Sequence, residues 1–204
     1  MAVKPKIGVI VLAAGGSTRM GSPKQLLPFR GVPLIRFAAE TALATRCGPV
    51  IVVLGSHAGE IALALTDLNV QLVENPDWEG GMGSSIRAGV MAAVEQECDG
   101  VILALADQPL ISPEILNGLV EAHVASGKPI VASQYAGTVG VPVLFSRRFF
   151  PHLVGLTPSQ GCKGLILSWP NESILIPCPE AELDIDTPAQ YSAVTDIDTP
   201  HHSV

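Results

Sequence analysis

The sequence predicts an α/β fold with a mainly parallel sheet covered by helices on both faces. Strand-like apolar segments alternate with helix-like segments along the chain, a pattern typical of that class. The apolar runs at 7–14, 50–54 and 101–106 contain no charged residue, as expected of parallel strands buried on both faces. With 204 residues, 48% of them hydrophobic, the chain is long enough to form one substantial core.

The expected elements follow from this alternation in chain order. Apolar runs predict strands over residues 7–13, 49–54, 70–73, 100–106, 129–133, 139–145 and 173–177. The segments between and after them predict helices over residues 33–46, 57–68, 84–97, 112–126, 146–154 and 161–168.

Two of the helix starts carry their own signals. Ser112 followed by Pro113 predicts an N-cap and a first helical residue. Ser84 or Ser85 is the expected cap of the helix over 84–97.

Composition excludes several classes of protein. The net charge of −7 argues against a general nucleic-acid binder. The mean hydropathy of +0.40 comes from apolar runs far shorter than the roughly 20 residues of a bilayer helix, so no membrane partner is expected. The start Met1–Lys6 lacks the apolar stretch of a signal peptide, which makes the cytoplasm the expected location. No linker divides the chain, so we expect one domain over 1–192 and a C-terminal tail over 193–204.

The four cysteines are widely spaced, form no CxxC pair and have no histidine at zinc-ligand spacing. We expect them to be buried or incidental thiols. They are Cys47, Cys98, Cys162 and Cys178.

A glycine-containing loop at 12–24, LAAGGSTRMGSPK, follows the first expected strand. Gly15 and Gly16 let backbone N–H groups approach an anion closely. Arg19 and Lys24 add positive charge to a segment without acidic residues. The loop therefore predicts phosphate binding, and the alternative is a tight turn with incidental basic residues.

The spacing of this loop matches neither of two common nucleotide motifs. It is neither GxGxxG nor GxxxxGK[ST]. A dinucleotide site also expects an acidic residue after the second strand, where this chain has Gly55-Ser56-His57. Both the dehydrogenase and the P-loop interpretations are disfavoured.

A second candidate is Asp107, which directly follows the apolar run at 101–106. This position predicts a carboxylate at the C-terminal edge of a parallel sheet, where open α/β folds bind ligands. One carboxylate, with waters and substrate phosphates, is a usual way to hold Mg²⁺. The alternative is that Asp107 only caps a turn before Pro109.

A third candidate is the pair Asp184 and Asp186, whose side chains share one side of an extended segment. Such a pair suits a cation or water. The alternative is that Asp186 or Thr187 caps a C-terminal helix opened by Pro188. The same five residues recur at 196–200, too close to the chain end to be well held, so we favour the first copy.

The fourth candidate is the segment 75–85, NPDWEGGMGSS, which leads into the helix over 84–97. Its glycines and serines at a helix N-terminus suit close contact with the base, ribose or phosphate of a ligand. The alternative is a capped loop without a ligand. Trp78 could stack on a ring or anchor the loop.

Together these motifs resemble the nucleotidyltransferases that attach a nucleotide to molybdopterin, specifically the molybdenum cofactor cytidylyltransferase group. The resemblance covers nearly the whole chain. It rests on LAAGGSTRMGSPK at 12–24, NPDWEGGMGSSIRAG at 75–89, ADQP at 106–109, VGVPVLF at 139–145, GCKG at 161–164 and DIDTP at 184–188.

The resemblance implies a three-layer α/β/α nucleotidyltransferase fold, similar to nucleotide-diphospho-sugar transferases. It implies that the terminal phosphate of molybdopterin attacks the α-phosphate of CTP and releases pyrophosphate, without a covalent enzyme intermediate. Arg19, Lys24 and Asp107 are the implied catalytic residues: Arg19 and Lys24 bind the triphosphate and stabilise the leaving pyrophosphate. Asp107 and Asp186 are the implied ligands of Mg²⁺.

The implied nucleotide-binding residues lie in the two glycine-containing loops. They are Leu12, Ala13, Ala14, Gly15, Gly16, Arg19, Lys24, Asn75, Gly81, Gly83, Ser84 and Ser85.

Family pattern also bears on the substrates. LAAG with a GMGSS-type loop is usual in the cytidylyl group and LAGG in the guanylyl group, so Ala14 and the segment 81–85 favour CTP. Two positions depart from the pattern: Cys162 stands where relatives often have Asp in GDKG or GDRG, and Val141 where they often have His in GHP. Both departures concern recognition of the pterin acceptor.

Three alternatives to this reaction stay open. The nucleotide could be GTP, or the acceptor another phosphate compound such as a sugar phosphate. The protein could also be a non-catalytic cofactor carrier or insertion chaperone for molybdenum hydroxylases, which are the protein partners that the resemblance implies. The presence of Arg19, Lys24 and Asp107 argues against a carrier.

Overall fold

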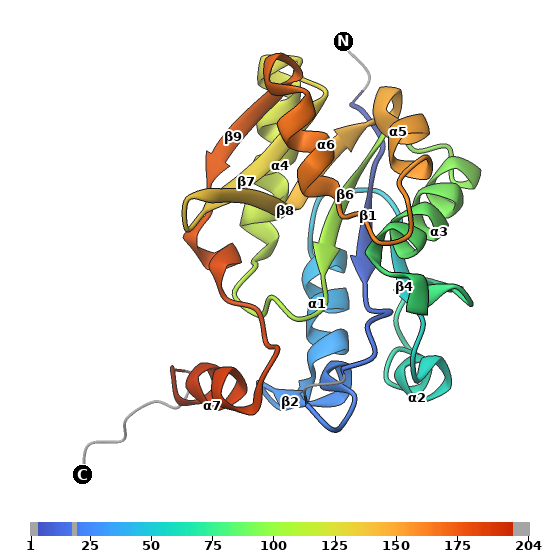
Figure 1. Cartoon of the computed structure of the whole chain (residues 1–204), viewed down its shortest axis with the longest axis vertical. Coiled ribbons are helices and arrows are strands. Elements are labelled where there is room, and N and C mark those ends of the chain that lie inside the picture. Colours follow the sequence, from blue (N-terminus) through green and yellow to red (C-terminus); the bar gives the residue numbers. More distant parts are fainter. Residues whose placement is uncertain (1–3, 18–19, 198–204) are drawn as a thin grey trace.

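The computed structural model describes residues 4–17 and 20–197 of the chain, with side chains described up to residue 194. Seven strands form one sheet in the order β5-β4-β1-β6-β8-β7-β9 (Figure 1). Their bounds are β1 Ile7–Leu12, β4 Val50–Leu54, β5 Gln71–Glu74, β6 Gly100–Leu105, β7 Ile130–Tyr135, β8 Thr138–Ser146 and β9 Ser173–Pro177. All seven expected strands are confirmed.

The sheet is mainly parallel, as predicted. The strands β5, β4, β1 and β6 pair in parallel, and β7 pairs in parallel with β9. Only β8, among the strands of this sheet, pairs antiparallel with both of its neighbours. A tight turn joins β7 to β8, so the return strand is a hairpin partner rather than a crossover strand.

Helices cover both faces of the sheet and give the three layers α/β/α (Figure 1). The helices α3, α5 and α6 pack on one face through Val90, Leu153 and Ile166. The helices α1, α2 and α4 pack on the other. The helices are α1 Leu34–Leu43, α2 Ala58–Leu63, α3 Met82–Glu95, α4 Pro113–Ser126, α5 Phe150–Val154, α6 Cys162–Ser168 and α7 Pro188–Ile197.

The period of two along β1 connects the sequence to these layers. Ile10 and Leu12 face the core under α3, while Val9 and Val11 face the core over α1 and α4. Because neighbouring residues of a strand point to opposite faces, a strand between two helical layers must be apolar throughout. All six residues of β1 are buried accordingly.

Short elements complete the chain. The strands β2 Pro28–Phe29 and β3 Val32–Pro33 form a small antiparallel hairpin that the sequence analysis missed. It packs with α7 in a third apolar cluster that includes Phe29, Leu34 and Val194. The 3₁₀ helices are η1 Lys24–Leu26, η2 Trp78–Gly80, η3 Arg147–Phe149, η4 Pro170–Glu172 and η5 Pro179–Glu182.

The predicted helix caps fared differently. The Ser112 hydroxyl accepts a hydrogen bond from the Ile115 N–H at 3.4 Å, with Pro113 as first helical residue, so this cap is confirmed. The cap expected at Ser84 or Ser85 is wrong, because α3 begins two residues earlier and Gly81 holds the cap position. The first turn of α3 therefore includes Gly83, which the sequence analysis placed in a loop.

The expected division into a domain over 1–192 and a tail stays a prediction. The last helix, α7, continues to Ile197, and residues 198–204 lie outside the described part of the chain. In the part described, no helix has the length and apolar character needed to cross a membrane.

Candidate active site

The candidate site lies at the carboxyl ends of two neighbouring parallel strands. Leu12 at the end of β1 pairs with Leu105 at the end of β6. The glycine-containing loop and Asp107 therefore leave the sheet side by side, where open α/β sheets bind ligands. The sheet topology confirms the predicted position of Asp107.

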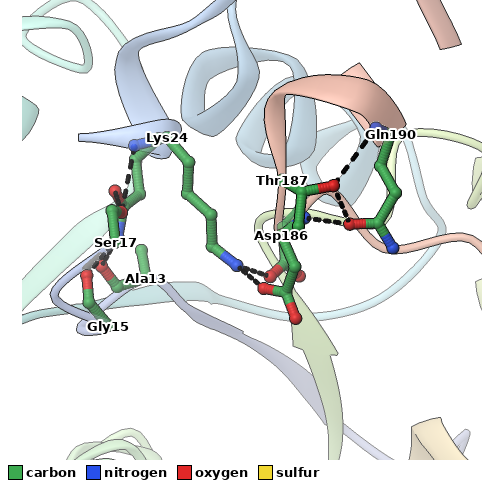
Figure 2. Close-up of polar contacts among 9 residues, drawn as sticks. Ala13, Gly15, Ser17, Lys24, Asp186, Thr187 and Gln190 are labelled. Atoms are coloured by element: carbon green, nitrogen blue, oxygen red, sulfur yellow. Dashed lines mark hydrogen bonds and ion pairs between the residues drawn. The ribbon is translucent and has the colours of Figure 1, made fainter. Parts of the chain in front are cut away.

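Lys24 joins the loop to two acidic residues that are distant in sequence. Its ammonium nitrogen lies 2.5 Å from Asp107 Oδ2 and 2.7 Å from Asp186 Oδ1. Figure 2 shows the lysine side chain reaching from the start of η1 toward Asp186. The three side chains are mostly buried, with 13%, 15% and 25% of the Lys24, Asp107 and Asp186 surfaces exposed. The structure thus brings together one basic and two acidic residues that the sequence analysis assigned to catalysis and metal binding.

The electrostatics of this cluster favour a bound cation. Burial alone would lower the pKa of Lys24, but the charges and hydrogen bonds of Asp107 and Asp186 outweigh it and raise that pKa. The other carboxylate oxygen of Asp107, Oδ1, is buried without a hydrogen-bond partner. Asp184 lines the same cavity and adds further negative potential. The ammonium of Lys24 compensates the negative charge of these mostly buried carboxylates.

The donor set fits a hard divalent cation that keeps part of its hydration shell. Carboxylate oxygens are the preferred protein ligands of Mg²⁺, which commonly uses one or two of them together with water and substrate phosphates. Asp107 and Asp186 both bind the ammonium of Lys24, and Asp107 Oδ1 is a buried acceptor without a hydrogen-bond partner. Within residues 4–17 and 20–197, no group of three or more His, Cys, Asp or Glu side chains is arranged to hold a metal. The site therefore fits a metal whose remaining ligands come from water and substrate.

The sequence left open whether Asp186 or Thr187 caps the C-terminal helix, and the structure answers this. The Thr187 hydroxyl accepts a hydrogen bond from the Gln190 N–H at 3.3 Å and so caps α7. Asp186 instead directs its carboxylate to Lys24, as Figure 2 shows. In the second copy of the motif, Asp196 lies near the end of α7 and Asp198 outside the described residues.

Two hollows meet at the glycine-containing loop. One, of about 340 Å³, is lined by Ala14, Gly16, Trp78, Glu79, Gly81 and Ser85, together with the residues shared by both. The other, of about 310 Å³, is lined by Ala13, Lys24, Gln25, Leu105, Ala106, Asp107, Asp184 and Asp186 with the same shared residues. Leu12, Gly15 and Met82 line both hollows. One elongated ligand could therefore occupy both while lying against Gly15.

Gln25 shapes the glycine-containing loop, and the sequence analysis missed it. Its side-chain nitrogen donates hydrogen bonds to the carbonyl oxygens of Ala13 and Gly15, at 3.0 and 2.8 Å. Its side-chain oxygen accepts one from the Ser17 hydroxyl at 3.0 Å. Only its place directly after Lys24 could have signalled this role. Arg19, the other basic residue of the loop, lies outside the described residues.

Asn75 and Ser84, expected at the nucleotide, are buried in a hydrogen-bond network of the protein. The Asn75 side-chain nitrogen donates to the hydroxyl oxygens of Ser84 and Ser85 at 2.9 and 3.0 Å. Of these three residues, only Ser85 lines a hollow. The network ties the segment after β5 to the first turn of α3 and so shapes the wall of the larger hollow.

The glycines of α3 allow another chain segment to pack closely. A Cβ on Gly83 would overlap the carbonyl oxygen of Thr157, and one on Gly81 would lie 2.8 Å from that of Pro158. The Gly83 N–H donates to the Pro158 carbonyl oxygen at 2.8 Å. Gly81 has φ of 116°, a conformation that favours glycine. These two glycines are thus required by protein packing, independently of any ligand.

Trp78 has the anchoring role that the sequence analysis offered, and stacking on a ring stays a prediction. It packs so closely on Gly55 that a Cβ there would lie 2.6 Å from the Trp78 Cβ. It also lines the larger hollow and is partly exposed. The side chain is anchored while its surface stays available to a ligand.

The two positions that depart from the family pattern lie in the core. Cys162 and Val141 are 4% and 7% exposed and belong to the same apolar cluster. Burial raises the pKa of the Cys162 thiol to about 12, so the thiol is neutral. All four cysteines are free, as expected.

Comparison with protein families gives a match over most of the chain. The model described as "MobA-like NTP transferase domain" matches residues 9–172.

Three curated proteins are similar in sequence. The purine catabolism protein PucB of Bacillus subtilis is 33% identical over 198 residues, covering 92% of this chain and 95% of that protein. The molybdenum cofactor cytidylyltransferase of Escherichia coli is 26% identical over 186 residues, covering 91% and 93%. The nicotine blue oxidoreductase of Paenarthrobacter nicotinovorans is 39% identical over 120 residues, covering 58% of each.

Solved structures agree with the fold. Rv0371c of Mycobacterium tuberculosis superposes with a TM-score of 0.82 and 30% identity, covering 96% of this chain and all of that one. A structure of Rv0371c in complex with manganese gives 0.76 and 28%, covering 94% and 98%. A Methanothermobacter nucleotidyl transferase gives 0.78 at 24% identity, covering 94% and 97%, and supports the fold alone. The predicted nucleotidyltransferase fold is confirmed.

Proposed function

The chain belongs to the MobA-like NTP transferase family, and from this premise we propose that it transfers CMP from CTP to the terminal phosphate of molybdopterin. Pyrophosphate is released. The reaction class follows from the family. The choice of nucleotide and acceptor is supported by the sequence motifs and by the name of the Escherichia coli relative, which is a molybdenum cofactor cytidylyltransferase.

The observation that carries this proposal is the Lys24–Asp107–Asp186 cluster beside the glycine-containing loop. Lys24 bonds both carboxylates, and all three line the hollow that continues past Gly15. A triphosphate lying along the loop would bring its phosphates to this cluster. A cofactor carrier that performs no chemistry has no need of such a buried charge arrangement.

In the proposed reaction, an oxygen of the acceptor phosphate forms a bond to the α-phosphorus of CTP. The bond from that phosphorus to the bridging oxygen breaks, and pyrophosphate leaves with the electron pair. Two anions must meet, so positioning and charge neutralisation supply most of the catalysis. Lys24, with Arg19 from the same loop, neutralises the leaving pyrophosphate. For this, the Lys24 ammonium exchanges its carboxylate partners for phosphate oxygens.

Asp107 and Asp186 would hold the proposed Mg²⁺. When bound there, the cation neutralises phosphate charge and polarises the α-phosphate. The exchange of Lys24 away from the carboxylates frees two oxygens for it, beside the unpartnered Asp107 Oδ1. The manganese complex of Rv0371c, a relative in structure, supports a divalent metal.

The larger hollow is the proposed site of the cytosine base. Leu12, Ala14 and Gly16 line it, and Trp78 adds an apolar surface. Gly81 and Ser85 complete its wall, while Asn75, Gly83 and Ser84 act by holding that wall in place. A nucleotide in this position spans both hollows.

The proposed recipient of the product is a molybdenum hydroxylase, in the cytoplasm. A different acceptor, such as a sugar phosphate, is the alternative to molybdopterin. It arises because Val141 and Cys162, which lie in the core, replace the His and Asp that relatives often carry. Names of relatives such as PucB and nicotine blue oxidoreductase leave the acceptor to experiment.

A substrate matrix tests the proposal. Purified protein with Mg²⁺ is incubated with CTP, GTP or ATP, each with molybdopterin or a sugar phosphate, and pyrophosphate is measured. We expect release with CTP and molybdopterin, and a product heavier than the acceptor by one CMP residue. Pyrophosphate release only with GTP would show that GTP, not CTP, is the nucleotide, and release only with a sugar phosphate would show that the acceptor is not molybdopterin. No pyrophosphate release with any pair would support the non-catalytic cofactor carrier.

A further inference from the structure

Three consecutive carbonyl groups of the glycine-containing loop accept hydrogen bonds from the protein. The Gln25 side-chain nitrogen donates to the carbonyl oxygens of Ala13 and Gly15, at 3.0 and 2.8 Å. The carbonyl oxygen between them, on Ala14, accepts a hydrogen bond from the Ser56 N–H at 3.3 Å. Three consecutive peptide groups are therefore held by their oxygens.

This arrangement fixes the direction of the N–H groups. Both peptide bonds whose oxygens Gln25 holds are trans, and in a trans peptide the N–H points opposite to the C=O. The N–H groups of Ala14 and Gly16 thus point away from Gln25. Within residues 4–17 and 20–197, the N–H groups of Ala14, Gly15 and Gly16 have no hydrogen-bond acceptor.

The space around this loop is open. A Cβ built on Gly15 would meet no atom within 4 Å, unlike one on Gly83. Gly15 lines both hollows, and Ala14 and Gly16 line the larger. Donors without acceptors at the wall of a cavity are the pattern of an anion site.

Gln25 is suited to hold this loop because of its amide. Its NH₂ supplies the two donors that the carbonyl oxygens of Ala13 and Gly15 require, and its oxygen accepts from the Ser17 hydroxyl. The Ser17 hydroxyl in turn accepts a hydrogen bond from the Lys24 N–H at 3.0 Å. The side chain is 4% exposed and so is held away from water. Glutamate or methionine at this position would supply no donor.

We propose that Gln25 is a positioning residue, which turns the N–H groups of Ala14 and Gly16 toward the triphosphate of the bound nucleotide. The inference rests on the proposed function only in taking a nucleoside triphosphate as the ligand. Both donors of the Gln25 amide are used by loop carbonyls, so the residue acts through the loop.

The test compares the Gln25→Met and Gln25→Glu variants with the wild-type protein. Calorimetry with CTP and Mg²⁺ gives the dissociation constant of the nucleotide. Each variant removes two hydrogen bonds that hold the loop, so we expect CTP affinity to fall about tenfold or more. Manganese affinity without nucleotide, measured by electron paramagnetic resonance, should change less than threefold, because Asp107 and Asp186 are untouched.

Amide NMR supplies a signature that a general loss of stability would not produce. In wild type, the Ala14 and Gly16 resonances should move downfield when CTP binds. At the same degree of saturation, they should move less in the Gln25→Met variant.

Gln108→Met is the matched control. Gln108 is 6% exposed and its side-chain nitrogen donates to the Ala181 carbonyl oxygen at 2.9 Å, away from the loop. We expect this variant to lose stability and to keep its CTP affinity. Unchanged CTP affinity in both Gln25 variants, or an equal loss in Gln108→Met, would overturn the inference. If the wild-type protein itself bound no nucleoside triphosphate, the proposed function would fail instead.

Discussion

Asp107 is the residue on which the proposed metal chemistry depends most. It is mostly buried, lies next to the end of β6, and has one oxygen on Lys24 and one without a partner. We expect Asp107→Ala to lower turnover by about 10²-fold or more, since it removes a ligand of the cation that neutralises the phosphates. Pyrophosphate release under saturating CTP and Mg²⁺ measures the effect, and circular dichroism checks that the fold is kept. Turnover near the wild-type value would show that the metal is held elsewhere.

Lys24 has two roles in the proposal, and a metal-binding measurement separates them. Because its ammonium holds Asp107 and Asp186 before substrate binds, it competes with a cation for their oxygens. We expect Lys24→Met to bind Mn²⁺ more tightly than wild type without nucleotide, by severalfold. The same variant should lose about 10²-fold or more in turnover, because the leaving pyrophosphate loses its counter-charge.

Lys4→Met is the control for this experiment, since Lys4 is exposed and precedes β1, at the end of that strand opposite to the site. It should leave both the Mn²⁺ affinity and the turnover unchanged. Weaker Mn²⁺ binding in Lys24→Met would show that the lysine supports the cation site rather than competing for it.

At the residue scale, the sequence predicted the charged residues of the candidate site better than the residues that shape the loops around it. Asp107 was found because parallel strands bring their carboxyl ends to one edge. Lys24 was found as a basic residue of the glycine-containing loop, and Asp186 from its place beside Asp184 on an extended segment. Gln25 was missed because two donors to loop carbonyls leave no periodic or compositional signal. Gly83 was assigned to a ligand, although a neighbouring loop fills the space above it.

At the element scale, α3 contacts the loop that follows α5. This contact connects the wall of the larger hollow to the second half of the chain. A Cβ on Gly83 would overlap the Thr157 carbonyl oxygen. We expect Gly83→Ala to destabilise the protein by about 1–3 kcal/mol, because one of two packed backbones must move. Urea unfolding measures the change.

Gly118→Ala is the matched control for this substitution. Gly118 lies within α4, and a Cβ there would meet nothing within 4 Å. This change should stabilise the helix by about 0.5–1 kcal/mol, since alanine is the better helix former. Equal effects of the two substitutions would show that the 157–160 contact carries no packing energy.

A surface ion pair gives the stability a defined pH dependence. Arg36 of α1 donates hydrogen bonds to both carboxylate oxygens of Asp67, at 2.6 and 2.8 Å, and lowers the pKa of Asp67 to about 2. Because the folded pKa lies below the unfolded value of about 3.9, the contribution is complete above that value and is lost as pH falls toward 2. The unfolding free energies of wild type and Asp67→Asn should therefore converge between pH 4 and 2.

Arg36→Met tests the cause of this convergence. In that background, Asp67→Asn should have a much smaller effect on stability at every pH between 2 and 6. A wild-type difference that stayed constant over this range would contradict the assigned pKa.

The seven strands of the large sheet were predicted in order, whereas the direction of β8, the cap of α3 and the short hairpin were not. Continuous apolar runs identify buried strands, but say nothing of strand direction, so the antiparallel β8 had to come from the structure. The hairpin β2–β3 has two residues in each strand, too few for any period to show. Ser84 was taken for a cap because serine favours that position, yet it lies within the first turn of α3. Its hydroxyl donates to the carbonyl oxygens of the cap residue Gly81 and of Asp77, which precedes the helix.

At the scale of the whole molecule, the two hollows adjoin at Leu12, Gly15 and Met82 and take their walls from segments distant in the sequence. In the proposed function, the cytosine base lies in the hollow that Ala14 and Trp78 line. We expect CTP to bind more tightly than GTP, because the motif pattern around Ala14 and the 81–85 segment is that of cytidylyl transfer. Calorimetric titration of both nucleotides with Mg²⁺ compares them, and tighter binding of GTP would reverse the assignment.

The most direct test of cytidylyl transfer is pyrophosphate release from CTP by the wild-type protein with Mg²⁺ and molybdopterin. The proposed function predicts release that requires all three components, and a product carrying one CMP per pterin. Absence of pyrophosphate with every combination of nucleotide and acceptor, from protein that binds CTP, would contradict it.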